Sequence, residues 1–116
     1  MKMYIAVLDE FPDFMTPTLV AHSVLWAHIK FSDNENYQQW LSESFRKVVL
    51  RVTQKEFDKI KELPNVCIGH ELHTLGGKDS SIVVCPTQKD DVPKVLKFAK
   101  MWKPLEQNNN LLNFNN

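Results

Sequence analysis

Residues 47–56 read Lys-Val-Val-Leu-Arg-Val-Thr-Gln-Lys-Glu, and they join the end of one element to the start of the next. The first six residues are rich in β-branched side chains and bounded by charge, which predicts a strand over 47–52. Thr53 and Glu56 then have the spacing of a capping box, in which each side chain satisfies a backbone N–H at the start of a helix. A strand followed directly by a capped helix over 54–63 indicates an α/β fold.

Apolar patterns on the N-terminal side of this stretch predict one strand and two helices. The run at 3–8 is almost continuously apolar, as in a strand buried on both faces. A wide apolar stripe predicts a deeply packed helix over 18–31, with Thr16 as N-cap and Pro17 at its first position. The spacing of the aromatic and leucine side chains predicts a shorter helix over 37–45.

The C-terminal half is expected to add two strands and a helix. Strands are predicted over 66–72 and 80–86, with turn residues at 76–79 between them. The last helix is expected to begin after Asp91 as N-cap, with Pro93 near its first position, and to run through Trp102 to Pro104.

The expected order is therefore β-α-α-β-α-β-β-α. We expect one α/β domain over 1–104, with a four-stranded mixed sheet covered by helices on both faces. An asparagine-rich tail over 105–116 follows, in which Leu111, Leu112 and Phe114 are positioned to dock on the domain or on a partner.

Composition excludes several classes of protein. The 14 basic and 14 acidic side chains cancel, so any site for a polyanion has to be a local patch. No apolar run approaches the roughly eighteen residues of a membrane-spanning helix, and acidic residues follow the first strand too soon for a secretory leader. Cys67 and Cys85 are expected to be reduced and buried, as in a cytoplasmic protein.

The first candidate site lies on the long helix. His22 and Trp26 are four residues apart and share a face. One interpretation makes His22 a proton shuttle or base and Trp26 a stacking surface, whereas the other makes them a partly buried histidine and a packing tryptophan. Asp9, Glu10 and Asp13 follow the first strand, at the edge where open α/β sheets bind ligands.

Residues 70–74, His-Glu-Leu-His-Thr, form the second candidate site. On a strand, His70 and Thr74 point to the same side and would line one pocket. The two histidines of this stretch fall on opposite faces, which argues against zinc, and we expect no metal and no cofactor. Gly76-Gly77-Lys78 lacks the spaced glycines of a phosphate-binding loop and is typical of a turn.

A third feature is a lysine stripe along the predicted last helix, preceded by one further lysine. Residues three apart drift around a helix of about 3.6 residues per turn, but these lysines stay within a broad stripe. A solvated surface is one interpretation, and contact with a phosphate backbone is the other. The residues concerned are Lys94, Lys97, Lys100 and Lys103, with Lys89 before them.

Three stretches resemble the type II peptidyl-tRNA hydrolase family, the archaeal and eukaryotic form. They are Tyr-Ile-Ala-Val-Leu-Asp at 4–9 with Phe-Met at 14–15 and the helix containing 20–25, then 45–53, and then His73-Thr74 with the strand at 82–86 and the closing helix. The resemblance spans residues 3–104. It implies a small domain with a four-stranded mixed sheet that often dimerises and cleaves the ester between a peptide and tRNA.

The same resemblance implies a site. Thr16-Pro17-Thr18 stands where the family has a Gly-Lys-Gly-Lys-like run, and His70-Glu71-Leu72 stands where it has Asp-Ala-Gly. Thr74 is retained, and His22 matches the family histidine if the helix is slipped by four residues. Hydrolysis on a polyanionic substrate needs a cation near the developing oxyanion, so the missing lysines predict binding without esterase activity.

The sequence thus predicts a cytoplasmic protein that binds tRNA, a nucleotide or a tRNA-handling host enzyme, and it allows a homodimer. The expected site residues are His22, His70 and Thr74 in the catalytic positions and Trp26, Lys94, Lys97 and Lys100 as ligand contacts. The lysine bias and the asparagine-rich tail also suit an AT-rich genome such as that of a phage.

Two alternatives remain open. An active hydrolase would use His22 as base, activated by Asp9 or Glu71, with Thr74 and backbone N–H groups holding the oxyanion. A protein-interaction module would instead use Trp40, Phe45 or the apolar tail.

Overall fold

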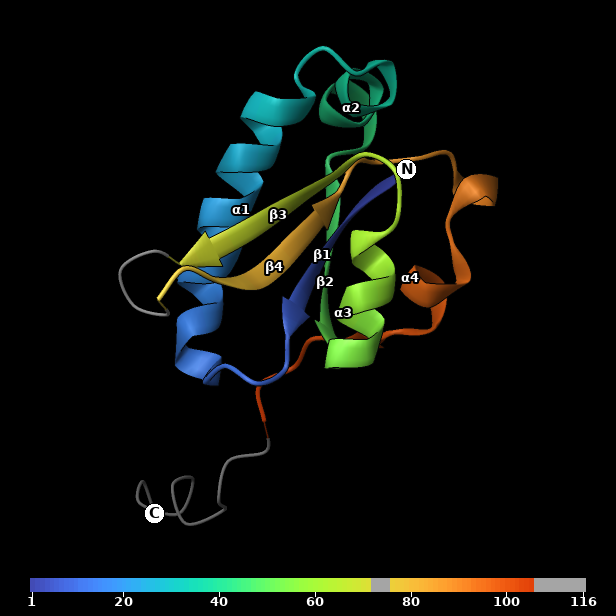
Figure 1. Cartoon of the computed structure of the whole chain (residues 1–116). Helices are drawn as coiled ribbons and strands as arrows, with labels where there is room; N and C mark the ends of the chain where they lie inside the picture. Colours follow the sequence, from blue (N-terminus) through green and yellow to red (C-terminus); the bar gives the residue numbers. More distant parts are fainter. Residues whose placement is uncertain (72–75, 106–116) are drawn as a thin grey trace, which may run out of the picture.

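The apolar run near the N-terminus forms β1 (Lys2–Leu8), which lies in the middle of the sheet. The computed structural model describes residues 1–71 and 76–105 and has one five-stranded sheet in the order β3-β4-β1-β2-β5 (Figure 1). Met3 and Ala6 of β1 are both fully buried, although they point to opposite faces. This burial follows from strands on both sides of β1 and helices above and below it.

The sheet is mixed, as predicted. β1 pairs in parallel with β2 (Arg46–Val52) and antiparallel with β4 (Lys78–Val84), and β4 pairs antiparallel with β3 (Val66–Glu71). The turn before β4 contains Gly76 and Gly77 with φ of 62° and 79°, a backbone form that glycine adopts without strain.

The expectation of four strands was wrong. A fifth strand, β5 (Lys100–Met101), pairs antiparallel with β2 where the sequence predicted the end of the last helix. The helix α4 (Lys94–Phe98) stops early because Ala99 is already extended, with ψ of 150°. The expected element order therefore gains a strand at its C-terminal end.

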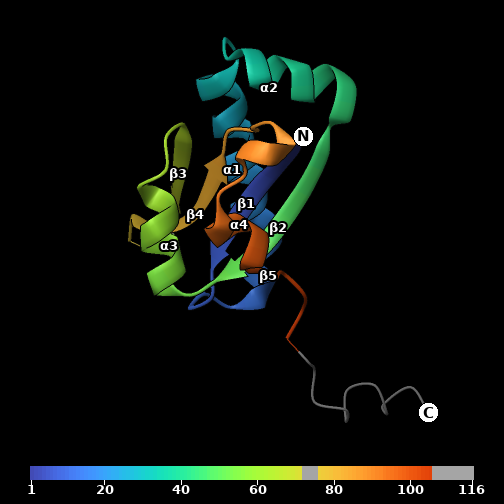
Figure 2. The same ribbon diagram turned by 90° about the vertical axis from the view of Figure 1, so that its right-hand side faces the viewer.

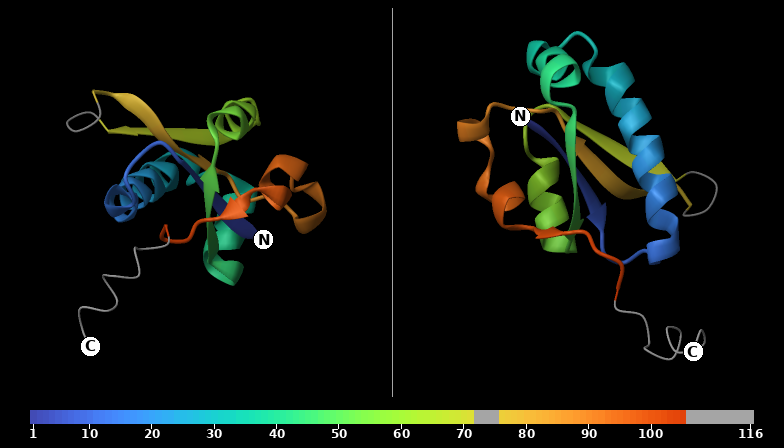
Figure 3. Two further views of the ribbon diagram at one scale, coloured as in Figure 1. Left: turned by 90° about the horizontal axis from the view of Figure 1, so that it is seen from below. Right: turned by 180° about the vertical axis from the view of Figure 1, so that it is seen from behind.

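Helices cover both faces of the sheet, as expected. Helices α1 (Thr16–Phe31) and α2 (Glu35–Gln39) lie on one face, and α3 (Gln54–Lys61) and α4 lie on the other (Figures 2 and 3). The buried side chains accordingly form two clusters, one on each side of the sheet. The first includes Phe31, Tyr37 and Trp40, and the second includes Phe57, Ile60 and Leu96.

The capping box at the start of α3 is confirmed. The Thr53 hydroxyl accepts a hydrogen bond from the Glu56 N–H at 3.2 Å, and the Glu56 carboxylate accepts one from the Thr53 N–H at 3.0 Å. Two backbone donors that the first turn would leave unpaired are thereby satisfied.

Two other helix starts differ from the prediction. Thr16 is the first residue of α1 rather than its cap, because a 3-10 turn over Asp13–Met15 leads into the helix and Met15 takes the cap position. Asp91 belongs to a separate 3-10 turn, Lys89–Asp91, and Pro93 is the N-cap of α4. Val92 is extended, with ψ of 122°, because a residue before proline is driven away from helical backbone.

The predicted helix over 37–45 is built from two parts. α2 continues into a turn of π-helix, Trp40–Ser44, which ends at Phe45 with a left-handed φ of 58°. Trp40 is a core residue, since it is 1% exposed and its indole N–H donates to the Arg46 carbonyl at 2.7 Å. Phe45, the other residue that the sequence offers as an interaction surface, is 57% exposed.

α1 approaches the sheet closely at one point. The Ser23 and Ser81 hydroxyl groups form a buried hydrogen bond between α1 and β4, beside Gly69 of β3. A Cβ atom at Gly69 would lie 2.5 Å from Ser23 Oγ and 2.7 Å from Ser81 Oγ. The absence of a side chain at Gly69 therefore permits this packing.

The described chain ends in a set of polar contacts around Asp13. Arg51 of β2 forms an ion pair with Asp13 at 2.9 Å and also donates to the Lys103 carbonyl at 2.6 Å. The Leu105 N–H donates to the same carboxylate at 2.6 Å. These hydrogen bonds, that from Arg51 above all, lower the pKa of Asp13. Asp13 thus holds the segment after β5 against the base of α1.

Both cysteines are free and buried, as predicted, and burial raises the pKa of the Cys85 thiol to about 11. None of the helices in the described part of the chain has the length and apolar character needed to cross a bilayer. The three apolar residues of the tail, Leu111, Leu112 and Phe114, lie outside the described residues.

Candidate anion-binding pocket

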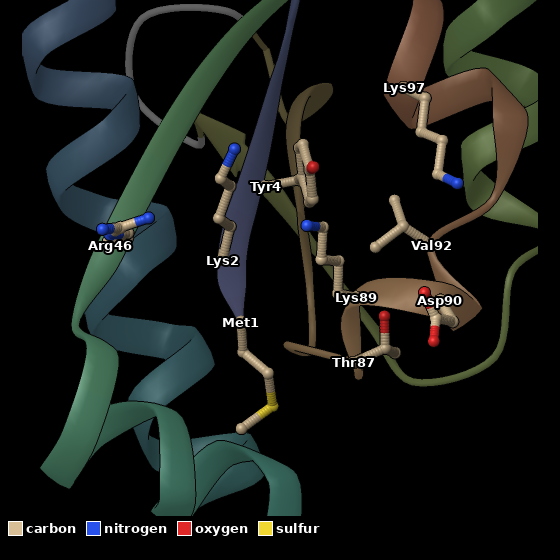
Figure 4. A pocket seen from close by; sticks show the side chains of 9 residues that line it. All are labelled: Met1, Lys2, Tyr4, Arg46, Thr87, Lys89, Asp90, Val92 and Lys97. Carbon is tan, nitrogen blue, oxygen red and sulfur yellow. The ribbon is translucent and has the colours of Figure 1, made fainter.

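A pocket of about 350 Å³ lies where β1 and β2 begin, beside the segment that leads from β4 into α4 (Figure 4). This volume is within the range of small-molecule sites. Nine residues line the pocket: Met1, Lys2, Tyr4, Arg46, Thr87, Lys89, Asp90, Val92 and Lys97.

Strand geometry explains the first part of the lining. Lys2 and Tyr4 are two residues apart on β1 and therefore share a face. Arg46 is the register partner of Lys2 on the neighbouring parallel strand, which places two cationic side chains next to each other. Like charges opposite one another on adjacent strands destabilise a sheet.

The remaining lining comes from the turn and helix after β4. The Gln88 side chain donates to Asn36 Oδ1 at 3.2 Å and Gln39 Oε1 at 3.4 Å, which holds the turn against α2. Lys89 follows directly, and its ammonium group is directed toward the ring of Tyr4 in Figure 4. Lys97 extends from α4 into the same space.

The pocket is strongly cationic. It contains four positive side chains and one carboxylate, that of Asp90, in a chain whose net charge is zero. Within residues 1–71 and 76–105, none of the four cationic groups takes part in an ion pair or donates a side-chain hydrogen bond. Four positive charges against one carboxylate leave an excess of positive charge, which favours a bound anion.

Sequence reasoning found half of these cationic residues. Lys97 was predicted as a ligand contact and Lys89 as part of its patch, but Lys94 and Lys100 are exposed and do not line the pocket. Lys2 and Arg46 were missed, because only the parallel register of β1 and β2 brings them together. The available signal was that each directly precedes a predicted strand.

The predicted aromatic site is a separate cluster. The ring centroids of His22 and Trp26 on α1 are 6.3 Å apart, and the Trp26 and His70 centroids are 5.4 Å apart. The sequence correctly placed His22 and Trp26 on one face. Thr74, the fourth residue expected in this site, lies outside the described residues.

No protein-family model matches the chain, and no curated protein matches it.

The two sites lie on opposite sides of the sheet. His22 and Trp26 belong to α1, whereas Lys97 of the cationic pocket belongs to α4. α1 and α4 lie on opposite sides of the sheet (Figure 3). Lys97, which was expected as a ligand contact in the same site as His22, therefore lies on the other side of the sheet from His22. The reason is that α1 packs on one face of the sheet and α4 packs on the opposite face.

The three acidic residues that follow β1 differ in their surroundings. Asp13 is engaged by Arg51 and Leu105, and Asp9 and Glu10 are exposed. Among the residues that the structure describes, no three His, Cys, Asp or Glu side chains are placed to hold a metal ion.

Proposed function

We propose that this chain binds the phosphate groups of a nucleotide, free or as part of tRNA, in the cationic pocket. The observation that supports the proposal is that Lys2, Arg46, Lys89 and Lys97 line one pocket and that none of them forms an ion pair with a described residue. Holding these charges together is unfavourable in the free protein, and a phosphate group would relieve the repulsion.

The lining offers each part of a nucleotide a suitable contact. The Arg46 guanidinium suits two oxygens of one phosphate, and the three lysines act as point charges. Tyr4 and Val92 are partly buried and provide apolar surface for a sugar or base. The resemblance to type II peptidyl-tRNA hydrolases supports tRNA as one carrier of these phosphates.

Calorimetric titration with ATP, with deacylated tRNA and with inorganic phosphate tests this proposal. Lys97→Ala and Arg46→Ala should each weaken binding by about tenfold or more, since a hydrogen-bonded charge contributes about 1.5–3 kcal/mol. Lys94→Ala is the matched control, because Lys94 lies on the same helix outside the pocket lining. Its affinity should stay within about twofold of that of the unmodified protein.

The titrations with ATP and with tRNA distinguish the two sources of phosphate. Tight binding of ATP alone assigns a free nucleotide, and binding of tRNA alone assigns a polymer. If Lys94→Ala weakens binding as much as Lys97→Ala does, binding depends on general surface charge rather than on the pocket. The proposal would then fail.

A second candidate function is hydrolysis of peptidyl-tRNA at the aromatic cluster. The gathering of His22, Trp26 and His70 favours it, because a base beside a stacking surface suits attack on an ester at the end of a nucleic acid. In this mechanism His22 would take the proton from an attacking water molecule.

An assay of peptidyl-tRNA cleavage decides this second candidate. His22→Ala should lower the rate by about 100-fold or more if His22 is the base. Lys55→Ala, an exposed change on α3, should leave the rate unchanged. If the unmodified protein shows no turnover, or if His22→Ala is fully active, the candidate is excluded.

A further inference from the structure

An apolar groove of about 300 Å³ lies on the α1 side of the sheet, away from both candidate sites. Its walls are Leu25 and His28 of α1, Tyr37 and Trp40 at the base, and Leu41 and Phe45 on the far side. Lys47 of β2 also borders it, with its ammonium group over the Phe45 ring. The groove therefore separates α1 from the start of β2.

Large apolar side chains of this groove are open to solvent. Leu25 is 61% exposed, Phe45 is 57% exposed and Leu41 is 39% exposed, and Ile29 nearby on α1 is 69% exposed. Isolated apolar residues are ordinary on a surface, but a contiguous group beside a groove marks a site of contact.

The described chain ends at one end of the space between α1 and β2. Leu105 is bound to Asp13 just before α1, and Arg51 at the far end of β2 holds Lys103. The right-hand view of Figure 3 shows this segment passing below β2 and ending near the base of α1, with α2 at the opposite end. Leu105 therefore lies at the lower end of the surface that carries the groove.

Chain length allows those residues to reach the groove. Leu25 is nine residues along α1 from Thr16, a rise of about 14 Å. Six extended residues from Leu105 to Leu111 span about 20 Å, and nine residues to Phe114 span about 30 Å. The apolar residues Leu111, Leu112 and Phe114 thus fall within reach of Leu25, one wall of the groove.

We propose that residues 111–114 of this chain dock in the apolar groove between α1 and β2. Leu111, Leu112 and Phe114 are the only apolar residues of the segment 106–116, and they are separated from Leu105 by a polar stretch of suitable length. Their attachment gives them a local concentration in the millimolar range, far above that of a second molecule in dilute solution.

Disulfide trapping in the full chain tests the proposal. Leu25→Cys and Phe114→Cys together should form a disulfide within one chain under mild oxidation, and Cys67 and Cys85 are buried and will not compete. Lys55→Cys with Phe114→Cys is the matched control, since Lys55 is exposed on α3 across the sheet. The groove pair should form at least about tenfold faster than the control pair.

The products on a non-reducing gel separate the alternatives. Docking is supported if a faster-migrating monomer, closed by a disulfide within one chain, forms from the groove pair and not from the control pair. A dimer whose yield rises with protein concentration would assign the groove to a second copy and overturn the proposal. Equal rates for the groove and control pairs, or no disulfide at all, would also overturn it.

A second measurement avoids engineered thiols. Replacing Leu111, Leu112 and Phe114 together by Ser should shift the methyl resonances of Leu25 and Leu41 and increase binding of an apolar dye. Replacing Asn108, Asn109 and Asn110 together by Ser should change neither. Both variants leave the described core unaltered, so identical effects from the two would count against the proposal.

Discussion

Gly69 sets how closely α1 approaches the sheet. The Ser23 and Ser81 hydroxyl groups occupy the space that a side chain at this position would need. Gly69→Ala should therefore lower the free energy of unfolding by about 1–3 kcal/mol, the usual effect of overpacking a tight interior. Urea denaturation followed by circular dichroism measures the change.

The serine hydroxyls provide the control for this prediction. With Ser23→Ala and Ser81→Ala present, the nearest remaining contact of the new methyl group is the Ser23 Cβ position at 3.5 Å, an ordinary packing distance. Gly69→Ala should then cost less than half of what it costs in the unmodified protein. An equal cost in both backgrounds would show that backbone conformation, rather than crowding, requires glycine.

Single residues also mark the limits of prediction for the candidate site. His22 and Trp26 were placed correctly because a helix fixes which residues share a face within a few positions. Lys2 and Arg46 meet only through pairing between strands distant in sequence. No local pattern encodes that register, so two of the four cationic groups of the pocket were missed.

At the level of elements, α3 depends on its cap. Thr53→Ala should lower the free energy of unfolding by about 0.5–2 kcal/mol, because the Glu56 N–H loses its acceptor. Thermal or urea unfolding measures the loss. Thr18→Ala, at an exposed position in the first turn of α1, is the control and should be close to neutral.

Strands and strongly capped helices were predicted well, and the region after β4 was not. β1 and β2 have runs of apolar residues, and α3 has a capping box at its start. α4 carries a helical pattern past Phe98, but pairing with β2 takes residues 100–101 into β5. Tertiary hydrogen bonding outweighed local preference there, and the fifth strand was therefore missed.

For the whole molecule, stability should fall in alkaline solution. Burial raises the pKa of the Cys85 thiol to about 11, against 9.0 for an ordinary cysteine. Between these values the unfolded chain releases a proton that the folded chain retains, so rising pH favours unfolding. Burial also raises the pKa of Cys67 and of Tyr37, which adds to the effect in the same direction.

Urea midpoints at about pH 8 and about pH 10 measure this dependence. The midpoint should be lower at the higher pH, and Cys85→Ala should reduce the difference between the two. A difference that Cys85→Ala leaves unchanged would assign the alkaline loss to other groups.

The position of β1 also bears on how the protein is made. β1 is synthesised before both of its neighbours, which are β2 at 46–52 and β4 at 78–84. Until residue 84 has left the ribosome, a strand that is apolar on both faces has no partner on one of its edges. Nascent chains of this protein should therefore be most dependent on chaperones during that interval, and an N-terminal fragment that stops before β4 should aggregate.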